Sequence, residues 1–354
     1  MLNFKNLTKP YIIAEIGCNH NGDIDLAKRM IVEAKKCGVD AIKLQLFSKE
    51  TLITEDHLQE LDRGDVKLEN IDKWETKELG LRNITEQIEK FVIGYEEHIE
   101  LFQYARKKGI GYASTPVTKE GVDFLVEQKV DFLKVASMDV NNPEFIEYVL
   151  SKDFPTVISL GLASVGEIEN VVKLIPSKQK KQVALLHTVS LYPPRDEIVN
   201  LRFINTLKNM CDVEIGYSDH TLGYSVALAA VALGASVVEK HFTLDKEMPG
   251  WDHKVSADPF EMEIICKESK RIWNALGTEK KDLTQEELDK RLKFRRSLVT
   301  ARDMKKEEVL KREDLVFKRP GTGIQPDQLN KALGKILNRD IEKDKTIFLG
   351  DLAD

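Results

Sequence analysis

The sequence lacks the features that mark three large classes of protein: long apolar runs, paired cysteines and an excess of basic residues. It has no run of about 18 or more apolar residues, so we expect no membrane-spanning helix. Its first residues, MLNFKNLTKP, also lack the apolar stretch of a signal peptide. The four cysteines are widely spaced without a CxxC pair, which argues against a disulfide framework and favours a reducing, cytoplasmic location. With a net charge of −6, the chain has no general basic field for nucleic acid.

Short β-rich runs alternate with longer amphipathic segments along most of the chain. The predicted strands span residues 12–16, 41–46, 111–114, 132–136, 156–160, 183–187, 213–217 and 236–240. The predicted helices span residues 26–36, 95–108, 119–128, 143–150, 165–174, 201–209, 226–233 and 259–275. Eight such pairs in roughly 275 residues predict an α/β fold, a (β/α)8 TIM barrel. A doubly wound open sheet is the alternative, but the first turn, Gly17 to Gly22, lacks the GxGxxG spacing of that fold.

Changes in composition divide the chain into parts. Residues 1–277 are predicted to form the catalytic barrel, the charged residues 278–296 a linker helix, and residues 297–354 a small second domain. The second domain has short predicted strands at residues 297–300, 315–317 and 346–349. A domain of about 60 residues is marginal alone, so we expect it to dock on a barrel. Residues 51–90, with Trp74, form an acidic insertion that is either a functional lid or a solvated segment without a role.

Two histidines end neighbouring predicted strands. His220 follows the 213–217 run, and His241 follows the 236–240 run. Because a helical segment joins these strands, they should be parallel, with both histidines at the same edge of the sheet. Two imidazoles with open positions for substrate and water suit a divalent metal. The alternative is that each histidine merely caps its strand; the pairing, and the polar residues that end the other strands, favour the metal site.

Polar side chains lie at the ends of the remaining predicted strands, which meet at one face of a barrel. They are Glu15, Lys43, Gln45, Thr115, Lys134, Ser137, Ser159, Ser190, Tyr192 and Ser218. A buried lysine is costly unless an anion faces it, so Lys43 and Lys134 with the hydroxyls predict a cradle for phosphate and carboxylate. A lysine that forms a Schiff base with a carbonyl substrate is the rival, and the histidine pair disfavours it. No basic residue is close to Glu15 in sequence, which suits a carboxylate directed at a cationic centre.

Several of these segments, in this order, resemble the sialic acid synthase family. They are Ile13-Ala14-Glu15-Ile16-Gly17, Asn19-His20-Asn21-Gly22, Lys43-Leu44-Gln45, Ser114-Thr115-Pro116, Lys134-Val135-Ala136-Ser137, Tyr192-Pro193, Gly216-Tyr217-Ser218-Asp219-His220 and Glu239-Lys240-His241-Phe242-Thr243-Leu244-Asp245. Near the C-terminus, Phe317-Lys318-Arg319-Pro320-Gly321-Thr322-Gly323 is similar to the signature of the family's antifreeze-like (SAF) domain. The resemblance covers nearly the whole chain.

The resemblance implies condensation of phosphoenolpyruvate with the open-chain aldehyde of an N-acetylated aminohexose, which gives a nine-carbon 2-keto-3-deoxy acid and phosphate. It implies Mn²⁺ dependence, with Mg²⁺ or Co²⁺ as alternatives, and a domain-swapped homodimer in which each SAF domain covers the partner's barrel. By the same resemblance, the residues take these roles: His220 and His241 as metal ligands, Glu15 as general base, Lys43, Thr115, Lys134, Ser137, Ser159, Ser190 and Ser218 as phosphoenolpyruvate contacts, and Gln45, Tyr192, Asp252 and Arg319 as sugar contacts.

Departures from the family pattern cluster where the sugar should bind. Leu160 stands where Thr is common, His187 where Cys is usual, and Trp251 where Pro is frequent. They leave the acceptor open between N-acetylmannosamine and a diacetamido-trideoxyhexose. Two rivals remain: an enzyme that joins phosphoenolpyruvate to a phosphorylated aldose, which needs further basic residues but no SAF domain, and a non-catalytic carbohydrate-binding protein, which has no need of Glu15.

Overall fold

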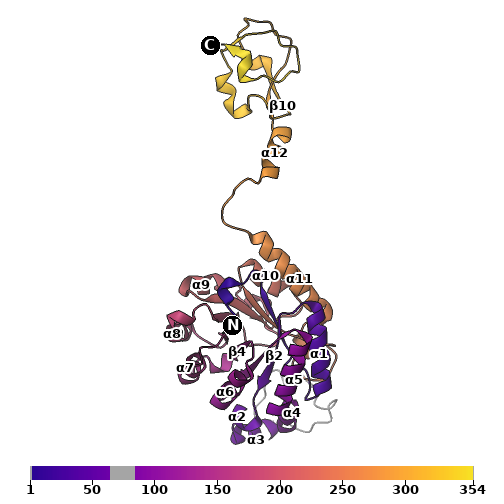
Figure 1. Cartoon of the computed structure of the whole chain (residues 1–354), viewed down its shortest axis with the longest axis vertical. Helices are drawn as coiled ribbons and strands as arrows, with labels where there is room; N and C mark the ends of the chain where they lie inside the picture. Colours follow the sequence, from indigo (N-terminus) through magenta and orange to yellow (C-terminus); the bar gives the residue numbers. More distant parts are fainter. Residues whose placement is uncertain (1, 64–83, 354) are drawn as a thin grey trace. The chain divides into compact units, whose positions relative to one another are not determined.

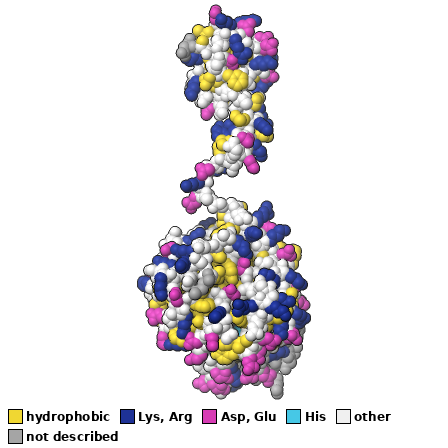
Figure 2. All heavy atoms as spheres, in the orientation of Figure 1, with side chains coloured by type: hydrophobic (Ala, Val, Ile, Leu, Met, Phe, Trp, Pro, Cys, Tyr) yellow, Lys and Arg dark blue, Asp and Glu magenta, His cyan; other side chains and the backbone are white. Residues whose placement is uncertain are grey.

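The computed structural model describes residues 2–63 and 84–353, which form two compact units, Met1–Gly277 and Thr278–Asp354. The segment 64–83, which contains Trp74, lies outside the described residues. Both units carry acidic and basic side chains intermingled on the face shown in Figure 2. In the described part of the chain, no helix has the length and apolar character needed to cross a membrane.

The first unit is a closed barrel of parallel strands in the order β1 to β8, as predicted. The strands are β1 Tyr11–Glu15, β2 Ala41–Leu46, β3 Gly111–Pro116, β4 Phe132–Val135, β5 Thr156–Ser159, β6 Val183–Thr188, β7 Glu214–Asp219 and β8 Val237–His241. β1 closes the barrel by pairing with both β2 and β8, and Glu15 lies opposite Lys43 on one side and His241 on the other.

Helices surround this barrel (Figure 1). Those between and after the strands are α1 Ile24–Cys37, α5 Tyr95–Lys108, α6 Lys119–Gln128, α7 Pro143–Ser151, α8 Val165–Leu174, α9 Phe203–Met210, α10 Ser225–Ala232 and α11 Pro259–Leu276. Their ends follow local chemistry: Asp23 accepts two backbone N–H bonds at the start of α1, and Gly38 ends it in the left-handed region at φ 95°. Ser164 and Glu167 form a capping box at the start of α8.

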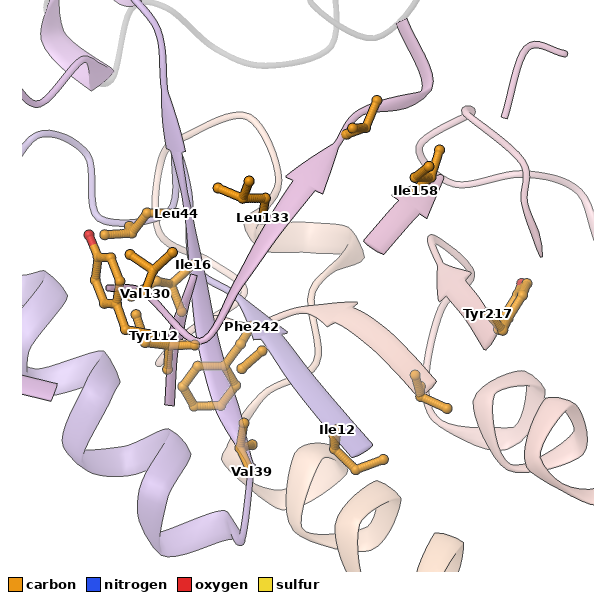
Figure 3. Close-up of a cluster of buried hydrophobic side chains, with 14 of the residues drawn as sticks. Ile12, Ile16, Val39, Leu44, Tyr112, Val130, Leu133, Ile158, Tyr217 and Phe242 are labelled. Carbon is orange, nitrogen blue, oxygen red and sulfur yellow. The ribbon is translucent and has the colours of Figure 1, made fainter. Parts of the chain in front are cut away.

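The strands bury two apolar layers. The outward-facing residues, among them Ile12, Leu44, Tyr112 and Leu133, pack in the large core of the barrel unit (Figure 3). The inward-facing residues of the amino-terminal half form a second cluster: Ile13, Ala41, Ala113, Phe132, Val157, Ala184, Leu186 and Val237, with Phe4. Two residues further along most of these strands, the inward positions are polar, because side chains alternate between faces with a period of two. The interior therefore changes from apolar to polar towards the carboxyl ends of the strands.

The predicted insertion contains three short helices in its described part. They are α2 Lys49–Leu52, α3 Glu55–Arg63 and α4 Ile84–Phe91. Helix α4 packs against both α2 and α3. Its residues Gln87, Ile88 and Phe91 are buried, so α4 is part of the barrel unit's packed structure.

The second unit holds a short helix, α12 Gln285–Phe294, and two small antiparallel sheets. β9 Ser297–Thr300 pairs with β10 Leu315–Lys318, and β11 Ile336–Leu337 with β12 Leu352–Ala353. The predicted helix over 278–296 is shorter than expected, because the capping box of Thr284 and Glu287 starts it late. The predicted strand at 346–349 is wrong: Thr346 makes only an isolated bridge, and a 3-10 turn begins at Leu349.

Candidate active site

A cavity of about 320 Å³ lies at the carboxyl ends of the barrel strands. Every barrel residue predicted for the site lines it: Glu15, Lys43, Gln45, Thr115, Lys134, Ser137, Ser159, Ser190, Tyr192, Ser218, His220, His241 and Asp252. These side chains come from all eight strands or the loops that follow them. The fold thus brings together residues that are up to 237 positions apart, from Glu15 to Asp252.

Glu15 and Lys43 form a buried ion pair at the floor of the cavity. The second oxygen of Glu15 accepts the backbone N–H of Gly17 at 2.5 Å, and Lys43 Nζ donates to Thr115 Oγ1 at 3.0 Å. Burial lowers the pKa of Lys43 to about 8, although Glu239 opposes this effect. Glu15 does have a basic neighbour, which its sequence surroundings concealed, because β1 and β2 pair with these two residues opposite each other.

Lys134 and Glu239 form a second group beside the first. Lys134 Nζ donates to Ser159 Oγ at 2.7 Å and lies 3.9 Å from Glu239 Oε1, which accepts a hydrogen bond from Ser218 Oγ at 3.2 Å. Burial lowers the pKa of Lys134. Burial alone would raise the pKa of Glu239. The attraction of Lys134 and Lys43 opposes this effect, and the pKa lies below its usual value. The floor of the cavity therefore holds two lysines and two carboxylates, Lys43 with Glu15 and Lys134 with Glu239, and all four are almost fully buried.

Hydroxyl groups gather at one side of these lysines. A Cβ atom placed on Gly161 would lie 2.6 Å from Ser137 Oγ and 2.3 Å from Ser190 Oγ. Only a residue without a side chain lets the two serines approach the chain here. With Ser159 and Ser218, they give the cavity several neutral donors that fit the oxygens of an anion.

His220 and His241 lie side by side at the same cavity, with ring centroids 5.4 Å apart. Tyr192 stacks on His220 at 4.1 Å and meets His241 edge-on at 5.7 Å. Burial lowers the pKa of His220 to about 4 and that of His241 also falls well below its usual value, so both rings are neutral at pH 7.

The two rings fit a divalent metal through their donor chemistry. His220 Nδ1 lies 2.8 Å from the carbonyl oxygen of Val189, which fixes that nitrogen as the N–H donor and leaves Nε2 as a lone-pair donor. His241 Nδ1 is buried and has no hydrogen-bond partner among the described residues. No cluster of three or more histidine, cysteine or acidic side chains able to hold a metal occurs in residues 2–63 and 84–353. Substrate oxygens and water would have to complete the coordination.

Asp252, Gln45 and Cys18 lie together at another part of the wall. Asp252 Oδ2 is 3.5 Å from His241 Nδ1, and burial raises the pKa of this carboxyl to about 7. Cys18 Sγ approaches Gln45 Oε1 at 3.9 Å. Burial raises the pKa of the Cys18 thiol far above its usual value, so the thiol is inert.

Some lining residues were missed from the sequence. They are Cys18, Phe47, Leu52, Val117, Ala136, Met138, Leu162 and Glu239; Trp251, singled out from the sequence as a departure from the family pattern near the sugar, also lines the cavity. Glu239 had a readable signal, because it precedes His241 by two residues on one strand and so shares its face. The apolar residues come from loops and from α2, where no strand period marks them.

Arg319 belongs to the second unit. It is exposed there, and its guanidinium lies over the ring of Phe294 at 5.0 Å from the ring centroid. Its predicted contact with a sugar remains a prediction.

The side chains that line the cavity can bind a molecule with two anionic groups. Two buried lysines and five serine or threonine hydroxyls can neutralise and orient anionic groups, because charge pairing strengthens where water is excluded. The carboxylates that line the cavity can accept a proton. This combination suits a condensation in which an anionic nucleophile meets a polarised carbonyl.

Each of the two units matches the model of a known protein family or domain. The NeuB family model matches residues 30–281 and the SAF domain model residues 295–353. The chain is 39% identical to an uncharacterised protein of Methanocaldococcus jannaschii (97% of this chain, 94% of that protein) and 34% identical to N,N'-diacetyllegionaminic acid synthase of Legionella pneumophila (96% and 93%). The crystal structure of N-acetylneuraminic acid (sialic acid) synthetase from Leptospira borgpetersenii, in complex with citrate, shares 34% identity with a TM-score of 0.66 (80% of this chain, 90% of that chain).

Proposed function

Because the chain belongs to the NeuB family, the sialic acid synthase family that its motifs resemble, we propose that it condenses phosphoenolpyruvate with an N-acetylated amino sugar. The product would be a nine-carbon 2-keto-3-deoxy acid of the sialic type, released with phosphate. The observation that carries this proposal is the pair of buried lysines, each with its own carboxylate and hydroxyl, beside two neutral histidines in one cavity.

In this proposal Lys43 and Lys134 hold the phosphate and carboxylate of phosphoenolpyruvate. Both lysines are almost fully buried, with 4% and 3% of their surface exposed, so their partners cannot be bulk water. Thr115, Ser137, Ser159, Ser190 and Ser218 supply hydroxyl donors around them. The carboxylates of Glu15 and Glu239 stabilise the lysines while the site is empty, since an unpaired buried charge would cost several kcal/mol.

Glu15 serves the chemical step. The C3 carbon of phosphoenolpyruvate forms a bond to the aldehyde carbon, whose oxygen becomes a hydroxyl after taking up a proton. Positive charge then develops at C2, where water adds and gives a proton to the carboxylate of Glu15. The C2–O bond to phosphate then breaks, the hydroxyl that water left on C2 gives its proton to the departing phosphate, and the keto group forms. The proton that Glu15 takes from water balances the one that the aldehyde oxygen takes up. Glu15 also stabilises the charge at C2 before the water adds.

His220 and His241 would hold the divalent metal, Mn²⁺ first and Mg²⁺ or Co²⁺ as alternatives. When bound, such an ion supplies Lewis-acid stabilisation of the negative charge that develops on the aldehyde oxygen, worth several kcal/mol. Tyr192, stacked on His220, holds that imidazole in place and faces the same cavity.

The acceptor is N-acetylmannosamine or a diacetamido-trideoxyhexose, oriented by Gln45, Tyr192 and Asp252. The rival with a phosphorylated aldose needs a second set of basic residues. Lys43 and Lys134 are the only lysine or arginine residues in the described lining of the cavity. The non-catalytic rival gives no reason to bury two carboxylates next to two lysines.

For assembly we propose a domain-swapped homodimer in the cytoplasm, with Arg319 reaching the acceptor's N-acetyl group in the partner's barrel. Exposed apolar side chains near the cavity mouth support a covering partner: Leu162 is 75% exposed and Met138 47% exposed, and both line the cavity. All four cysteines are free, in keeping with a reducing compartment.

A phosphate-release assay tests the proposal. The chain is mixed with phosphoenolpyruvate, Mn²⁺ and each member of a panel of acetamido sugars, among them N-acetylmannosamine, its 6-phosphate and diacetamido-trideoxyhexoses. We expect phosphate only with an unphosphorylated acetamido sugar present. Turnover with the 6-phosphate alone would favour the phosphorylated-aldose rival, and no turnover with any sugar would favour the binding protein.

A further inference from the structure

Helix α4 touches the loop that carries Asp252. The indole Nε1 of Trp251 donates to Gln87 Oε1 at 2.8 Å, and the ring of Trp251 meets Phe91 edge-on with centroids 5.0 Å apart. Gln87 and Phe91 each expose 2% of their surface. Trp251 and Asp252 both line the cavity, whereas Gln87 and Phe91 do not. The last part of the insertion therefore supports a wall of the candidate active site from behind.

The buried amide of Gln87 uses only its oxygen in a hydrogen bond among the described residues. Its Oε1 accepts the indole N–H, while its Nε2 is buried without a partner among the described residues. An apolar side chain of the same size would avoid the cost of burying that amide. The amide is useful here because it gives the indole N–H of Trp251, a partly buried residue, a hydrogen-bond acceptor. The hydrogen bond also fixes the plane of the indole ring.

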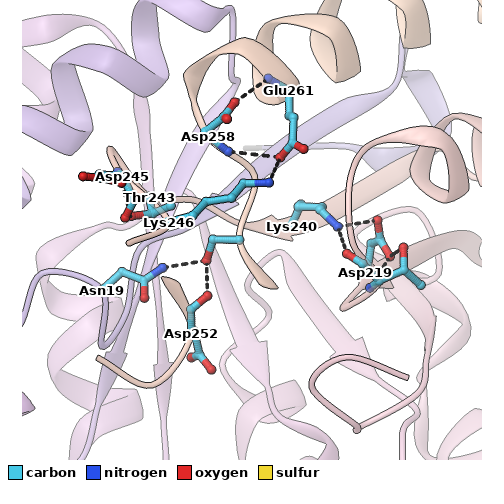
Figure 4. Close-up of polar contacts among 11 residues, drawn as sticks. Asn19, Asp219, Lys240, Thr243, Asp245, Lys246, Asp252, Asp258 and Glu261 are labelled. Carbon is cyan, nitrogen blue, oxygen red and sulfur yellow. Dashed lines mark hydrogen bonds and ion pairs between the residues drawn. The ribbon is translucent and has the colours of Figure 1, made fainter. Parts of the chain in front are cut away.

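The same loop is also held by the turn after β1. Asn21 Nδ2 donates to the carbonyl oxygen of Pro249 at 2.8 Å. Asn19 Nδ2 donates to Ser256 Oγ at 2.8 Å, and that hydroxyl donates to the carbonyl oxygen of Asp252 at 2.6 Å (Figure 4). The Asn19-His20-Asn21-Gly22 motif thus braces the loop of Asp252 through these side chains.

Helix α4 and this turn are themselves in contact. A Cβ atom on Gly22 would lie 2.0 Å from the carbonyl oxygen of Lys90, and Gly22 has φ 71°, so a side chain is excluded on both counts. The loop from Pro249 to Asp252 therefore contacts two supports, α4 and the turn after β1, that also touch each other. A shift of α4 would move Trp251 directly.

We propose that Gln87 is a positioning residue that fixes Trp251 as a wall of the acceptor pocket, so that α4 determines the affinity for the acceptor sugar. This inference rests on the proposed function. A displacement of about 1 Å in such a wall is enough to weaken binding of a closely fitted ligand. Lys43 and Lys134 lie on strands β2 and β4 and not on the loop of Trp251, so we expect phosphoenolpyruvate binding not to depend on Gln87.

The test is a double-mutant cycle with Gln87→Leu and Trp251→Phe, which each remove one partner of the hydrogen bond. Steady-state kinetics with the best acetamido sugar give KM for the acceptor and for phosphoenolpyruvate. We expect the acceptor KM to rise about tenfold in each single variant, or about 1.4 kcal/mol. The double variant should be no worse than the more affected single variant, and the phosphoenolpyruvate KM should change less than twofold.

Gln103→Leu is the matched control, because Gln103 is an exposed glutamine on α5. It should leave both KM values unchanged. If Gln87→Leu does not fold, Gln87→Met takes its place in the same cycle. Unchanged acceptor KM values, additive effects in the double variant, or an equal change in the phosphoenolpyruvate KM would overturn the inference while wild-type turnover persists. A wild-type chain that turns over no acetamido sugar would overturn the proposed function, and this inference with it.

Discussion

The ion pair between Lys240 and Asp219 should contribute strongly to the stability of the barrel. Both side chains are fully buried, and Lys240 Nζ lies 2.8 Å from Asp219 Oδ2 and 2.5 Å from the carbonyl oxygen of Thr221 (Figure 4). The pair joins the ends of β7 and β8, next to His220 and His241. Lys240→Met removes the cation and leaves the carboxylate of Asp219 buried.

The magnitude follows from burial and geometry. Asp219 keeps two hydrogen bonds from Thr221, at 2.9 and 2.8 Å, but loses its only described countercharge. Removing one partner of a buried pair costs about 3–5 kcal/mol, because the remaining charge cannot reach water. With an m-value of about 3 kcal/mol per M, the urea midpoint should fall by roughly 1–1.7 M. Salt should not restore it, since buried charges are poorly screened.

Tryptophan fluorescence during urea unfolding of the whole chain measures this effect in the barrel alone, because all three tryptophans, Trp74, Trp251 and Trp273, precede residue 278. The double variant Lys240→Met with Asp219→Asn should recover most of the loss, since no charge stays buried. Lys119→Met is the control: its pair with Glu144 is exposed, so the midpoint should stay unchanged. A Lys240→Met midpoint equal to that of the wild type would show that the buried pair does not stabilise the barrel.

Five other substitutions test the site and the fold. Glu15→Gln should lower kcat by about 10² while phosphoenolpyruvate affinity stays within a few fold, as stopped-flow binding and steady-state rates would show, because a lost general base affects the chemical step. His220→Ala and His241→Ala should each weaken Mn²⁺ binding in an electron paramagnetic resonance titration and abolish turnover without unfolding the barrel. Arg319→Ala should raise the acceptor KM and leave Mn²⁺ and phosphoenolpyruvate binding intact. Burial lowers the pKa of His98 to about 4, below its unfolded value of about 6.5, so the unfolded chain binds the extra proton between these values and stability falls as the pH drops through that window. In His98→Gln, urea midpoints measured from pH 7 to pH 4 should fall less steeply than in the wild type, because unfolding takes up about one proton fewer.

Subunit mixing gives the matched control for the Arg319 and Glu15 variants. In a swapped dimer, an Arg319→Ala chain combined with a Glu15→Gln chain forms one site with both defects and one with neither. Activity should therefore reappear after subunit exchange. No recovery after confirmed exchange would show that each small domain serves its own barrel. A variant that combines His220→Ala with His241→Ala and stays fully active after chelator treatment would contradict the predicted metal site.

Regular periodicity made the barrel predictable from sequence. The 41–46, 95–108, 119–128 and 165–174 segments have the predicted bounds, and the other barrel elements differ by a few residues at their ends. Because inward positions alternate, placing a strand also placed its polar carboxyl end. Lys43, Lys134 and His241 were predicted for the site because they lie at or near these strand ends.

Contacts between distant segments were beyond such local rules. The pairing of Glu15 with Lys43 depends on which strands are neighbours, and the bond from Trp251 to Gln87 joins residues 164 positions apart. Neither leaves a periodic pattern in the sequence. The expected strand at 346–349 failed because its β-prone residues bond to two different segments, through Leu298 and Ile324, and form no ladder.

Carbon–carbon bond formation defines the proposed reaction, and nuclear magnetic resonance with phosphoenolpyruvate labelled with ¹³C at C3 detects it. The labelled substrate is incubated with the chain, Mn²⁺ and the acetamido sugar that gives the fastest phosphate release. We expect the label to become the methylene carbon of a 2-keto-3-deoxy acid, coupled to the proton on the former aldehyde carbon, in step with phosphate release. Label recovered in the methyl group of pyruvate, or phosphate released at the same rate without sugar, would contradict the proposed reaction.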